Sequence, residues 1–413
     1  MASTDVVIVG GGVAGCTLGH LLERRSSNVT LLEKTAIGGL LRDIELASGY
    51  YCDSAPHLLF FDEGTEPEVE TLFSEFTTLT HHNFFAATYP RGSLRDPHHY
   101  PVSKENIERW DDAGRIRAEL EEVPGKTQSE YFEEYLLNQV GPTLYNRYYR
   151  NYTESHWGID PERITGDWFD FKIKFHETER DFFGDGAYYP DDTYTDVLTE
   201  MVSDCEVVYD GATGLITDGD RIEGIQTASG EVVSGDTYVS TIDPTLLVAD
   251  VEPSPRYRSM IVLGAHIVAE RPFPTHVDWG YFPNHYAFTR ITDYAFTPQN
   301  IPDGERLLTA EFPCFVGDDI WGRREEWFER YLVDFFETQG LEIGVIATEV
   351  RQVSRAYPLP VAEEIQKFER VNNVLTSYSN MLNLGRTSTY EYIWIKDIVA
   401  QAYEIADKIE LTP

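Results

Sequence analysis

The feature that most constrains this chain is a short run of glycines that lies between two apolar segments near its start. Residues 5–9 (DVVIV) are rich in β-branched side chains, which is typical of a buried parallel strand. Residues 10–15 (GGGVAG) then satisfy the pattern GxGxxG, and an amphipathic stretch continues to about residue 25. A second strand, 28–32, ends at Glu33. Strand, glycines, helix, strand and acid in this order predict a Rossmann-type βαβ unit that binds a dinucleotide.

Each residue of the glycine loop has an expected role. Gly10 permits the tight turn after the strand, Gly12 lets the backbone approach a pyrophosphate, and Gly15 lets the helix pack on the strand. Val13 and Ala14 lie at the helix N-terminus, where free N–H groups face the phosphates. The alternative is a glycine-rich turn without a ligand, but that alternative does not account for the second strand and its acid.

The segment after the second strand supplies further expected contacts. Glu33 is placed to accept hydrogen bonds from the adenosine ribose hydroxyls, and Lys34 follows it. The stretch IGGLLR, which ends at Arg42, resembles the second FAD motif of glutathione-reductase-type and amine-oxidase-type flavoproteins. The resemblance implies that Gly39 and Leu40 pass close to the pyrophosphate and that Arg42 offsets its charge. An ordinary surface loop that contains an arginine is the alternative.

Two later segments indicate the rest of this domain. Residues 206–208 (EVV) form an expected strand after a helical stretch at 192–203. The resemblance to these flavoproteins implies that the strand lies on the adenine side of FAD and that Val207 contacts the cofactor. Residues 238–244 (YVSTIDP) fit a strand and turn that return to the domain. Between them, residues 212–236 alternate with turns and predict a small hairpin excursion.

Four segments together resemble the UDP-galactopyranose mutase family, thinly but along most of the chain. Residues 56–60 (PHLLF) resemble its PHxFH segment, and residues 148–161 (YYRNYTESHWGIDP) resemble its YTxxxWGxxP stretch. Residues 288–292 (FTRIT) resemble its YTRIT segment, and residues 384–392 (LGRTSTYEY) resemble its GRxGTYxY motif. Their order and spacing are similar to those of the family.

The resemblance implies a site built from these segments. His57 is expected near the isoalloxazine ring, Arg290 beside the flavin, and Arg386 in contact with FAD. The stretch 148–161 is expected to border a nucleotide-sugar pocket. The residues expected to act in catalysis are His57, Arg290 and Tyr392. Those expected to contact the cofactor, in addition to the loops above, are His57, Arg386 and Tyr392. Those expected to contact the substrate are Tyr152, Trp157, Lys174, Arg290, Tyr390 and Tyr392.

Structural roles remain open for some of these residues. Trp157 also fits a helical core and His57 a hydrogen-bonded loop position. Tyr390 and Tyr392 alternate as strand residues do, so one of them can be structural. Arg290 and Arg386 lie in apolar, β-rich segments, where an arginine needs an anionic partner.

The resemblance also implies a reaction. In the mutases, the N5 nitrogen of reduced flavin attacks the anomeric carbon of a UDP-sugar, and the sugar ring opens and recloses. We therefore expect FAD in its reduced form, a nucleotide sugar or related glycosyl donor, and NAD(P)H as the candidate external reductant.

The substrate segments depart from the family's pattern, so alternatives stay open. Residues 310–314 (AEFPC) lack a diphosphate-binding arginine of the family, Lys172, Lys174 or Arg180 stands near a second such position, and Trp394 replaces an acid. The first alternative is an FAD-dependent oxidase or desaturase that takes hydride from an amine or polyene-like substrate. The second is a flavin-binding protein without catalysis.

Composition limits the setting and the partners. The net charge is −37, with 70 acidic and 33 basic residues, and the acids are spread along the chain. Such self-repulsion is tolerable where salt screens it, which predicts a halophile's cytoplasm and excludes nucleic acid as a partner. No apolar stretch is long enough to span a membrane, and no secretory signal is visible at the start. The four cysteines lie far apart in the sequence, so neither a metal site nor disulfides are expected. A homodimer is the candidate assembly.

The expected fold class is α/β: a Rossmann-type FAD-binding domain with a helical insertion and a second domain that contains an antiparallel sheet. The expected ranges are 1–80, 190–250 and 375–413 for the FAD-binding domain, 95–185 for the helical insertion, and 250–375 for the substrate domain. Helical periodicity marks 104–121, 127–151 and 398–409, and a strand pattern marks 260–268 and 306–312.

Overall fold

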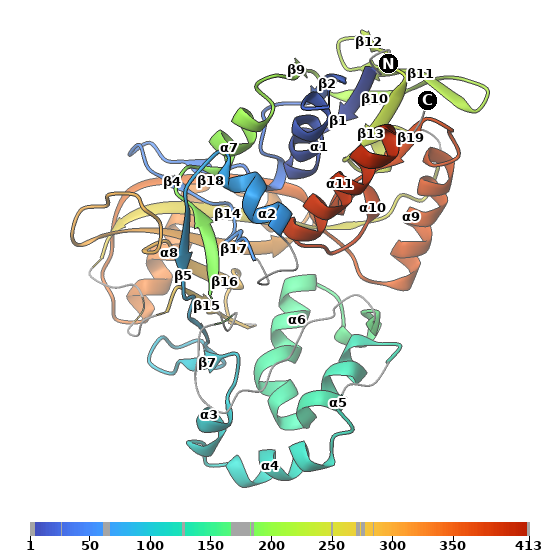
Figure 1. Ribbon diagram of the computed structural model, residues 1–413. Helices are drawn as coiled ribbons and strands as arrows, with labels where there is room; N and C mark the ends of the chain where they lie inside the picture. Colours follow the sequence, from blue (N-terminus) through green and yellow to red (C-terminus); the bar gives the residue numbers. More distant parts are fainter. Residues whose placement is uncertain are drawn as a thin grey trace.

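The computed structural model describes residues 5–25, 27–60, 67–125, 129–166, 182, 186–248, 251–269, 273, 277–283 and 285–410. Figure 1 shows a Rossmann-type unit that holds both chain ends, a large sheet beside it, and a helical unit at the far end from the termini. The fold class expected from the sequence is confirmed. Lys174 lies outside the described residues.

The Rossmann-type unit is built on five parallel strands in the order β19-β13-β1-β2-β9. The strands are β1 (Asp5–Val9), β2 (Asn28–Glu33), β9 (Glu206–Tyr209), β13 (Thr237–Ser240) and β19 (Met381–Asn383). Helices α1 (Val13–Glu23), α7 (Tyr194–Met201) and α11 (Ile395–Glu410) pack against the sheet and bury one apolar core with β1. The βαβ unit, the strand around Val207 and the last helix are therefore where the sequence predicts them.

A small antiparallel sheet interrupts this unit between β9 and β13. Its strands are β10 (Ala212–Asp218), β11 (Arg221–Thr227) and β12 (Val232–Val233). The hairpin excursion expected at 212–236 is confirmed.

The large sheet has seven strands in the order β18-β14-β17-β16-β15-β6-β7. They are β6 (Ala86–Thr88), β7 (His98–Tyr100), β14 (Tyr257–Val268), β15 (Trp279–Tyr281), β16 (Arg290–Asp293), β17 (Glu305–Cys314) and β18 (Gly344–Pro358). All neighbours are antiparallel except β15 and β6, and helix α8 (Glu325–Thr338) packs its apolar side on the sheet. The strands expected at 260–268 and 306–312 lie within β14 and β17.

The sheet also takes β6 and β7 from the chain before residue 250, which the sequence does not reveal. Each of these strands has three residues. Three residues are too few for an alternation of apolar and polar side chains to stand out.

The helical unit is more broken than its periodicity suggests. Its segments are α3 (Lys104–Glu108), α4 (Ala113–Glu122), α5 (Phe132–Leu144), a π-helical turn (Tyr145–Tyr149) and α6 (Arg150–Trp157). Gly141, with φ of 71°, precedes Pro142 and kinks α5. These segments share an apolar core that includes Ile116, Leu136 and Leu144.

The remaining elements connect these units. They are β3 (Ile44–Glu45), β4 (Tyr51–Cys52), α2 (Pro67–Ser74), β5 (Leu79–His82), β8 (Ala187–Pro190), α9 (Ala362–Leu375), α10 (Arg386–Thr389) and short 3₁₀ turns at Gly39–Leu41, Pro161–Arg163, Pro244–Leu246 and Asp319–Gly322.

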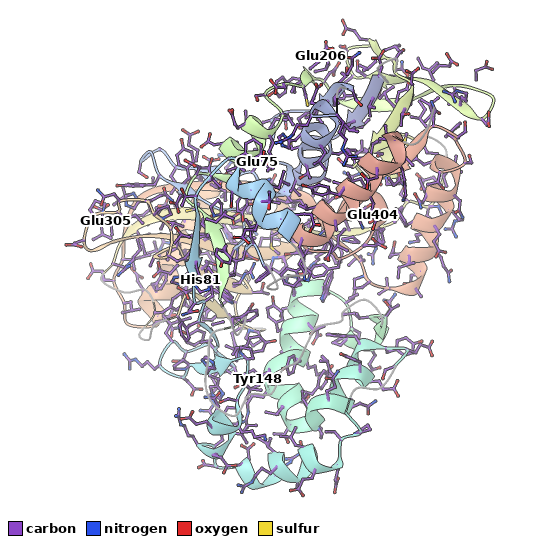
Figure 2. All side chains as sticks on the ribbon, in the orientation of Figure 1. Glu75, His81, Tyr148, Glu206, Glu305 and Glu404 are labelled. Atoms are coloured by element: carbon purple, nitrogen blue, oxygen red, sulfur yellow. The ribbon has the colours of Figure 1, made fainter. Side chains whose placement is uncertain are left out.

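Acidic side chains lie on separate parts of the molecule. Glu75, Glu206 and Glu404 belong to the Rossmann-type side and Glu305 to the large sheet, and Figure 2 labels all four. Across the described residues, none of the helices combines the length and the apolar character that crossing a membrane requires.

Candidate functional site

The loops at the carboxyl ends of the five parallel strands meet at one edge of the sheet. Gly38 N donates to Gly11 O at 2.8 Å, which joins the loops after β2 and β1. Thr241 Oγ1, after β13, lies 3.3 Å from Gly10 O. A Cβ on Gly385, after β19, would lie 2.8 Å from Ala14 Cβ. Ligands of open α/β sheets bind at this edge, so the expected dinucleotide loops are brought together where such a ligand fits.

The glycines of the first loop differ in what surrounds them. Gly10 has φ of 112°, and a Cβ there would lie 2.3 Å from Thr241 Oγ1. A Cβ on Gly15 would lie 1.9 Å from Gly10 O, so the helix and the turn require glycine at both positions. Among the described residues, a Cβ on Gly12 would meet Gly39 Cα alone, at 3.6 Å. Space is thus left open at Gly12, the position where a pyrophosphate is expected.

Glu33 holds the first two loops together. Its Oε2 accepts from Gly11 N at 2.8 Å, and its Oε1 accepts from Thr35 N at 2.8 Å. Oε1 also accepts from Ala36 N at 3.3 Å and Thr35 Oγ1 at 3.5 Å, so Oε2, with one donor among the described residues, is the oxygen that keeps capacity for a ribose hydroxyl. Val207 pairs with Leu31 on the neighbouring strand, and Lys34 lies beside the turn that follows β9.

Two arginines approach the second glycine loop. Arg42 follows the 3₁₀ turn Gly39–Leu41, and Arg351 of β18 donates to Gly39 O. Burial and then the charge of Arg42 lower the pKa of Arg351 to about 10. Its Nη1 is buried without a hydrogen-bond partner among the described residues. Two guanidinium groups beside backbone that is expected to approach a pyrophosphate suit an anion; the sequence did not point to Arg351.

A row of side chains crosses the large sheet opposite these loops. In the strand register, Arg351 and Glu311 both pair with Val262, Glu311 pairs with Arg290, and Arg290 pairs with Tyr281. Directly paired residues share a face of a sheet. The row therefore places a cation, an apolar residue, an anion, a cation and a phenol side by side.

Arg290 has the anionic partner that its surroundings require. Its Nε lies 2.6 Å from Glu311 Oε1, and the two side chains are 16% and 3% exposed. Burial alone would lower the pKa of Arg290, but the Glu311 carboxylate raises it, so the guanidinium stays charged.

His57 is fixed by a buried aspartate. Asp53 Oδ1 lies 2.7 Å from His57 Nδ1, and Asp53 Oδ2 accepts from His57 N at 2.8 Å. Tyr294 OH donates to Asp53 O at 2.8 Å. The pairing orients the imidazole and leaves Nε2 for a ligand. The charges of His57 and Asp53 both act on the pKa of Glu311, so His57 and the Arg290 pair lie in one region.

Aromatic rings from α6, β15, β18 and the segment after α10 close this region. Tyr152 of α6 lies 5.0 Å from Tyr281, measured between ring centroids. Trp157 of α6 lies 5.7 Å from Tyr357 of β18 and 6.3 Å from Tyr392. Tyr152, Trp157 and Tyr392, expected from the sequence, are thus joined by Tyr281 and Tyr357. Sequence reasoning missed these two tyrosines because neither lies in the segments that carry the resemblance.

Arg386 lies against the same rings. Its guanidinium carbon is 4.9 Å from the Tyr392 ring centroid, and its Nη2 donates to Ile393 O at 2.8 Å. Its position directly after Gly385 places it beside the start of α1, where the sequence expects it to reach the cofactor.

Tyr390 has a different position. Its hydroxyl donates to Arg256 O at 2.6 Å and accepts from Leu359 N at 3.1 Å, and its ring stacks on Phe368 at 5.0 Å. Its φ is 58° and it is 2% exposed. The structure commits Tyr390 to the fold, which leaves Tyr392 as the tyrosine of this motif that meets the other site rings.

Arg258 also lies near the rings, but its Nε and Nη2 already donate to backbone oxygens of the protein. Its Nε donates to His156 O at 2.7 Å, and its Nη2 donates to Ser155 O at 2.9 Å and Pro313 O at 3.1 Å. Burial lowers its pKa to about 10. Arg258 therefore holds the end of α6 in place.

Comparisons with known proteins agree on the fold. The family described as NAD(P)-binding Rossmann-like domain matches residues 8–76. No curated protein matches the chain. A structure of reduced UDP-galactopyranose mutase aligns with a TM-score of 0.83 at 18% identity, over 99% of this chain and 94% of that one. The chain has the fold of UDP-galactopyranose mutase. The resemblance seen in the sequence is confirmed as a likeness of fold.

Oxidases share the mutase fold. A protein assigned as a protoporphyrinogen oxidase, from Exiguobacterium sp. 255-15, aligns with a TM-score of 0.76 at 16% identity over 100% of both chains. Putrescine oxidase bound to putrescine aligns with a TM-score of 0.63 at 12% identity over 99% of both chains. The mutase fold thus carries more than one chemistry, and the site residues must decide between them.

Proposed function

We propose that this chain is a flavoenzyme that binds FAD along the carboxyl ends of its parallel strands. Glu33 would take the ribose, and the backbone at Gly12 and Gly39 would take the pyrophosphate, with Arg42 as the charge partner. Gly385 and Arg386 would flank the other end of the cofactor. The open space at Gly12 and the buried Nη1 of Arg351 both fit an anionic group at this position.

We further propose that the substrate is a nucleotide sugar or a related glycosyl donor. The observation that carries this proposal is the meeting of Tyr152, Trp157 and Tyr392 with the Arg290–Glu311 pair. Aromatic faces pack on the apolar faces of sugars and of uracil, and a fixed guanidinium stabilises charge that develops nearby. When bound and reduced, the flavin supplies a nucleophilic nitrogen for glycosyl transfer.

The residues of this chain would then orient the substrate and exclude water. The rings of Trp157, Tyr357 and Tyr392 would close over it and remove solvent from the reacting region. His57, with Nδ1 held by Asp53, would hold or release a proton at Nε2. Arg290 would keep a positive charge there without a change of protonation.

An FAD-dependent oxidase or desaturase is the second candidate, and one observation favours it. Arg258, Arg290 and Arg386 each donate to an acceptor of the protein. Arg386 Nε is nevertheless buried without a partner among the described residues. A diphosphate clamp made of free guanidinium groups is therefore not preformed by Arg258 and Arg290. An amine or polyene-like substrate carries no phosphate and would need no such clamp.

One experiment separates the two candidates. The FAD-loaded protein, purified in high salt, is reduced with dithionite without air and given a panel of UDP-sugars, and products are separated by chromatography. Ring-isomerised product that only the reduced protein forms would support the mutase-type reaction. Absence of product, together with rapid reoxidation in air and rereduction by amines or polyenes, would move the assignment to the oxidase. NAD(P)H in place of dithionite tests the external reductant.

We also propose that the protein works in a high-salt cytoplasm. The support is the net charge of −37, which molar salt screens over a few ångströms.

A further inference from the structure

One polar ring within the aromatic cluster is not used by the fold. His156 of α6 is 8% exposed, and its Nδ1 is buried without a hydrogen-bond partner among the described residues. Buried polar atoms in native proteins almost always have a partner. An unused buried nitrogen inside a candidate binding region therefore points to a ligand group.

The ring of His156 is nevertheless held firmly. It stacks on Tyr152, with centroids 5.4 Å apart and ring planes 17° apart. Its other neighbours are Trp157 at 5.2 Å and Tyr357 at 5.1 Å. The backbone is fixed as well, because His156 O accepts from Arg258 Nε at 2.7 Å. The imidazole is thus oriented by packing while its Nδ1 stays available.

The charge state of the ring follows from its surroundings. Burial, and then the nearby guanidinium groups of Arg258 and Arg290, lower the pKa of His156 to about 3. The imidazole is neutral at physiological pH and offers one N–H donor and one lone pair. Among the neighbours described above, the arginines offer donors alone, so His156 adds a nitrogen acceptor to the cluster.

The position of His156 indicates which part of the substrate it meets. His156 stacks on Tyr152, the Tyr152 ring lies 5.0 Å from that of Tyr281, and Tyr281 pairs with Arg290 in the strand register. His156 therefore lies on the Arg290 side of the aromatic rings, where the flavin is expected. The part of a glycosyl donor that reacts at the flavin is the sugar, and sugars carry hydroxyl groups.

Resting on the proposed function, we infer that His156 is a specificity-determining residue that hydrogen-bonds a hydroxyl of the sugar unit. The structural basis is a buried, packed imidazole whose Nδ1 has no partner, at the Arg290 side of the ring cluster. On this assignment, binding of the nucleotide unit alone should not depend on His156.

The test compares His156→Phe with His156→Gln in the FAD-loaded, dithionite-reduced protein. Phe keeps a ring of similar shape without nitrogen, and Gln restores polar atoms. Binding of UDP-galactose and of UDP is measured by anaerobic calorimetry. We expect His156→Phe to weaken UDP-galactose binding about tenfold, to leave UDP binding within about twofold, and His156→Gln to recover part of the loss.

Each other outcome has a definite meaning. Equal binding of UDP-galactose by His156→Phe and the parent overturns the inference and leaves the proposed function standing. Equal weakening of UDP-galactose and UDP overturns the assignment to the sugar. If the parent binds neither compound, the glycosyl-donor proposal falls, and the role of His156 falls with it.

Thermal melting of the same variants without a UDP compound distinguishes a role of His156 in the stability of the fold from a role in binding. Because Nδ1 has no partner in the described protein, His156→Phe should melt at the same temperature as the parent or higher. A melting temperature several degrees lower would show that the nitrogen serves the fold, which also overturns the inference.

Discussion

Arg290 and Glu311 lie opposite each other on β16 and β17, and Arg290 Nε is 2.6 Å from Glu311 Oε1 in a region from which water is largely excluded. Neither charge is stable there alone, because a buried ion needs a partner. The pair therefore links the stability of the large sheet to the charge of the candidate site.

Arg290→Ala should lower both stability and turnover. It leaves Glu311 buried without its partner, which costs about 3–5 kcal/mol in free energy of unfolding. Adding Glu311→Ala should recover part of that stability but none of the turnover, since the cation at the site stays absent. Denaturant unfolding, flavin absorbance and turnover of the three variants check this. Full activity in the double variant would remove Arg290 from the site.

Gly12→Val should abolish FAD retention without unfolding the protein. The Cβ of a side chain at Gly12 would meet Gly39 Cα alone among the residues that the structure describes, at 3.6 Å, and the side chain would extend into the expected pyrophosphate position. Gly15→Val is the contrast, because a Cβ there would lie 1.9 Å from Gly10 O and should prevent folding. Circular dichroism and the flavin-to-protein absorbance ratio report the two effects. Normal FAD content in Gly12→Val would contradict the loop assignment.

Tyr392→Phe and Tyr390→Phe should have opposite effects. Tyr392→Phe is expected to lower turnover about tenfold or more, to lower FAD content less than turnover, and to leave the melting temperature unchanged. Tyr390→Phe should leave turnover unchanged but lose about 1–3 kcal/mol of stability, because Leu359 N loses its acceptor. Steady-state kinetics and thermal melting on both variants provide the test. Reversed effects would exchange the roles of the two tyrosines.

Asp43 should make stability fall as pH rises from about 4 to about 6. Burial, and then the charge of Asp53, raise the pKa of Asp43 from 3.8 to about 6. In this window the folded protein binds a proton that the unfolded chain has released, so protonation favours the folded state and its loss at higher pH destabilises it. Asp43→Asn keeps an oxygen that can accept from Thr195 N and Oγ1. The pH dependence of unfolding should therefore be flatter in Asp43→Asn than in the parent; identical slopes would contradict the assignment.

Salt should stabilise the protein strongly. With a net charge of −37, repulsion between exposed carboxylates acts over a screening length of about 10 Å at 0.1 M salt and about 3 Å at 1 M. The melting temperature should rise between these KCl concentrations, and a variant with exposed acids changed to neutral residues, such as Glu206→Gln with Glu404→Gln, should show a smaller rise. Equal melting temperatures at both concentrations would speak against a high-salt setting.

The sequence allowed the dinucleotide loops to be predicted because their signals are local. The strand, the glycines and the acid all lie within residues 5–33, so the pattern can be recognised in one short segment. Arg290 could be recognised as needing an anion, but Glu311 as its partner depends on the register of two strands, since the two residues lie 21 positions apart in the sequence. Arg351 reaches Gly39 across 312 residues, which no motif encodes.

Tyr390 and Tyr392 show a second limit of the sequence. Their spacing suggests a strand, in which both side chains would share a face. Tyr390 instead adopts a left-handed conformation at the end of α10, which turns the chain between the two rings. Tyr390 then packs in the fold and Tyr392 meets the site rings. The sequence does not reveal this difference, because it depends on the positive φ of Tyr390.

The contact between Gly385 and Ala14 has a consequence for how the protein is made. The N-terminal loop is closed by the segment after β19, which follows almost the whole chain in sequence. During translation, the proposed cofactor site stays incomplete until residue 386 has left the ribosome. Products shortened before β19 lack the segment that closes the loop, so under the proposed function they should not retain FAD.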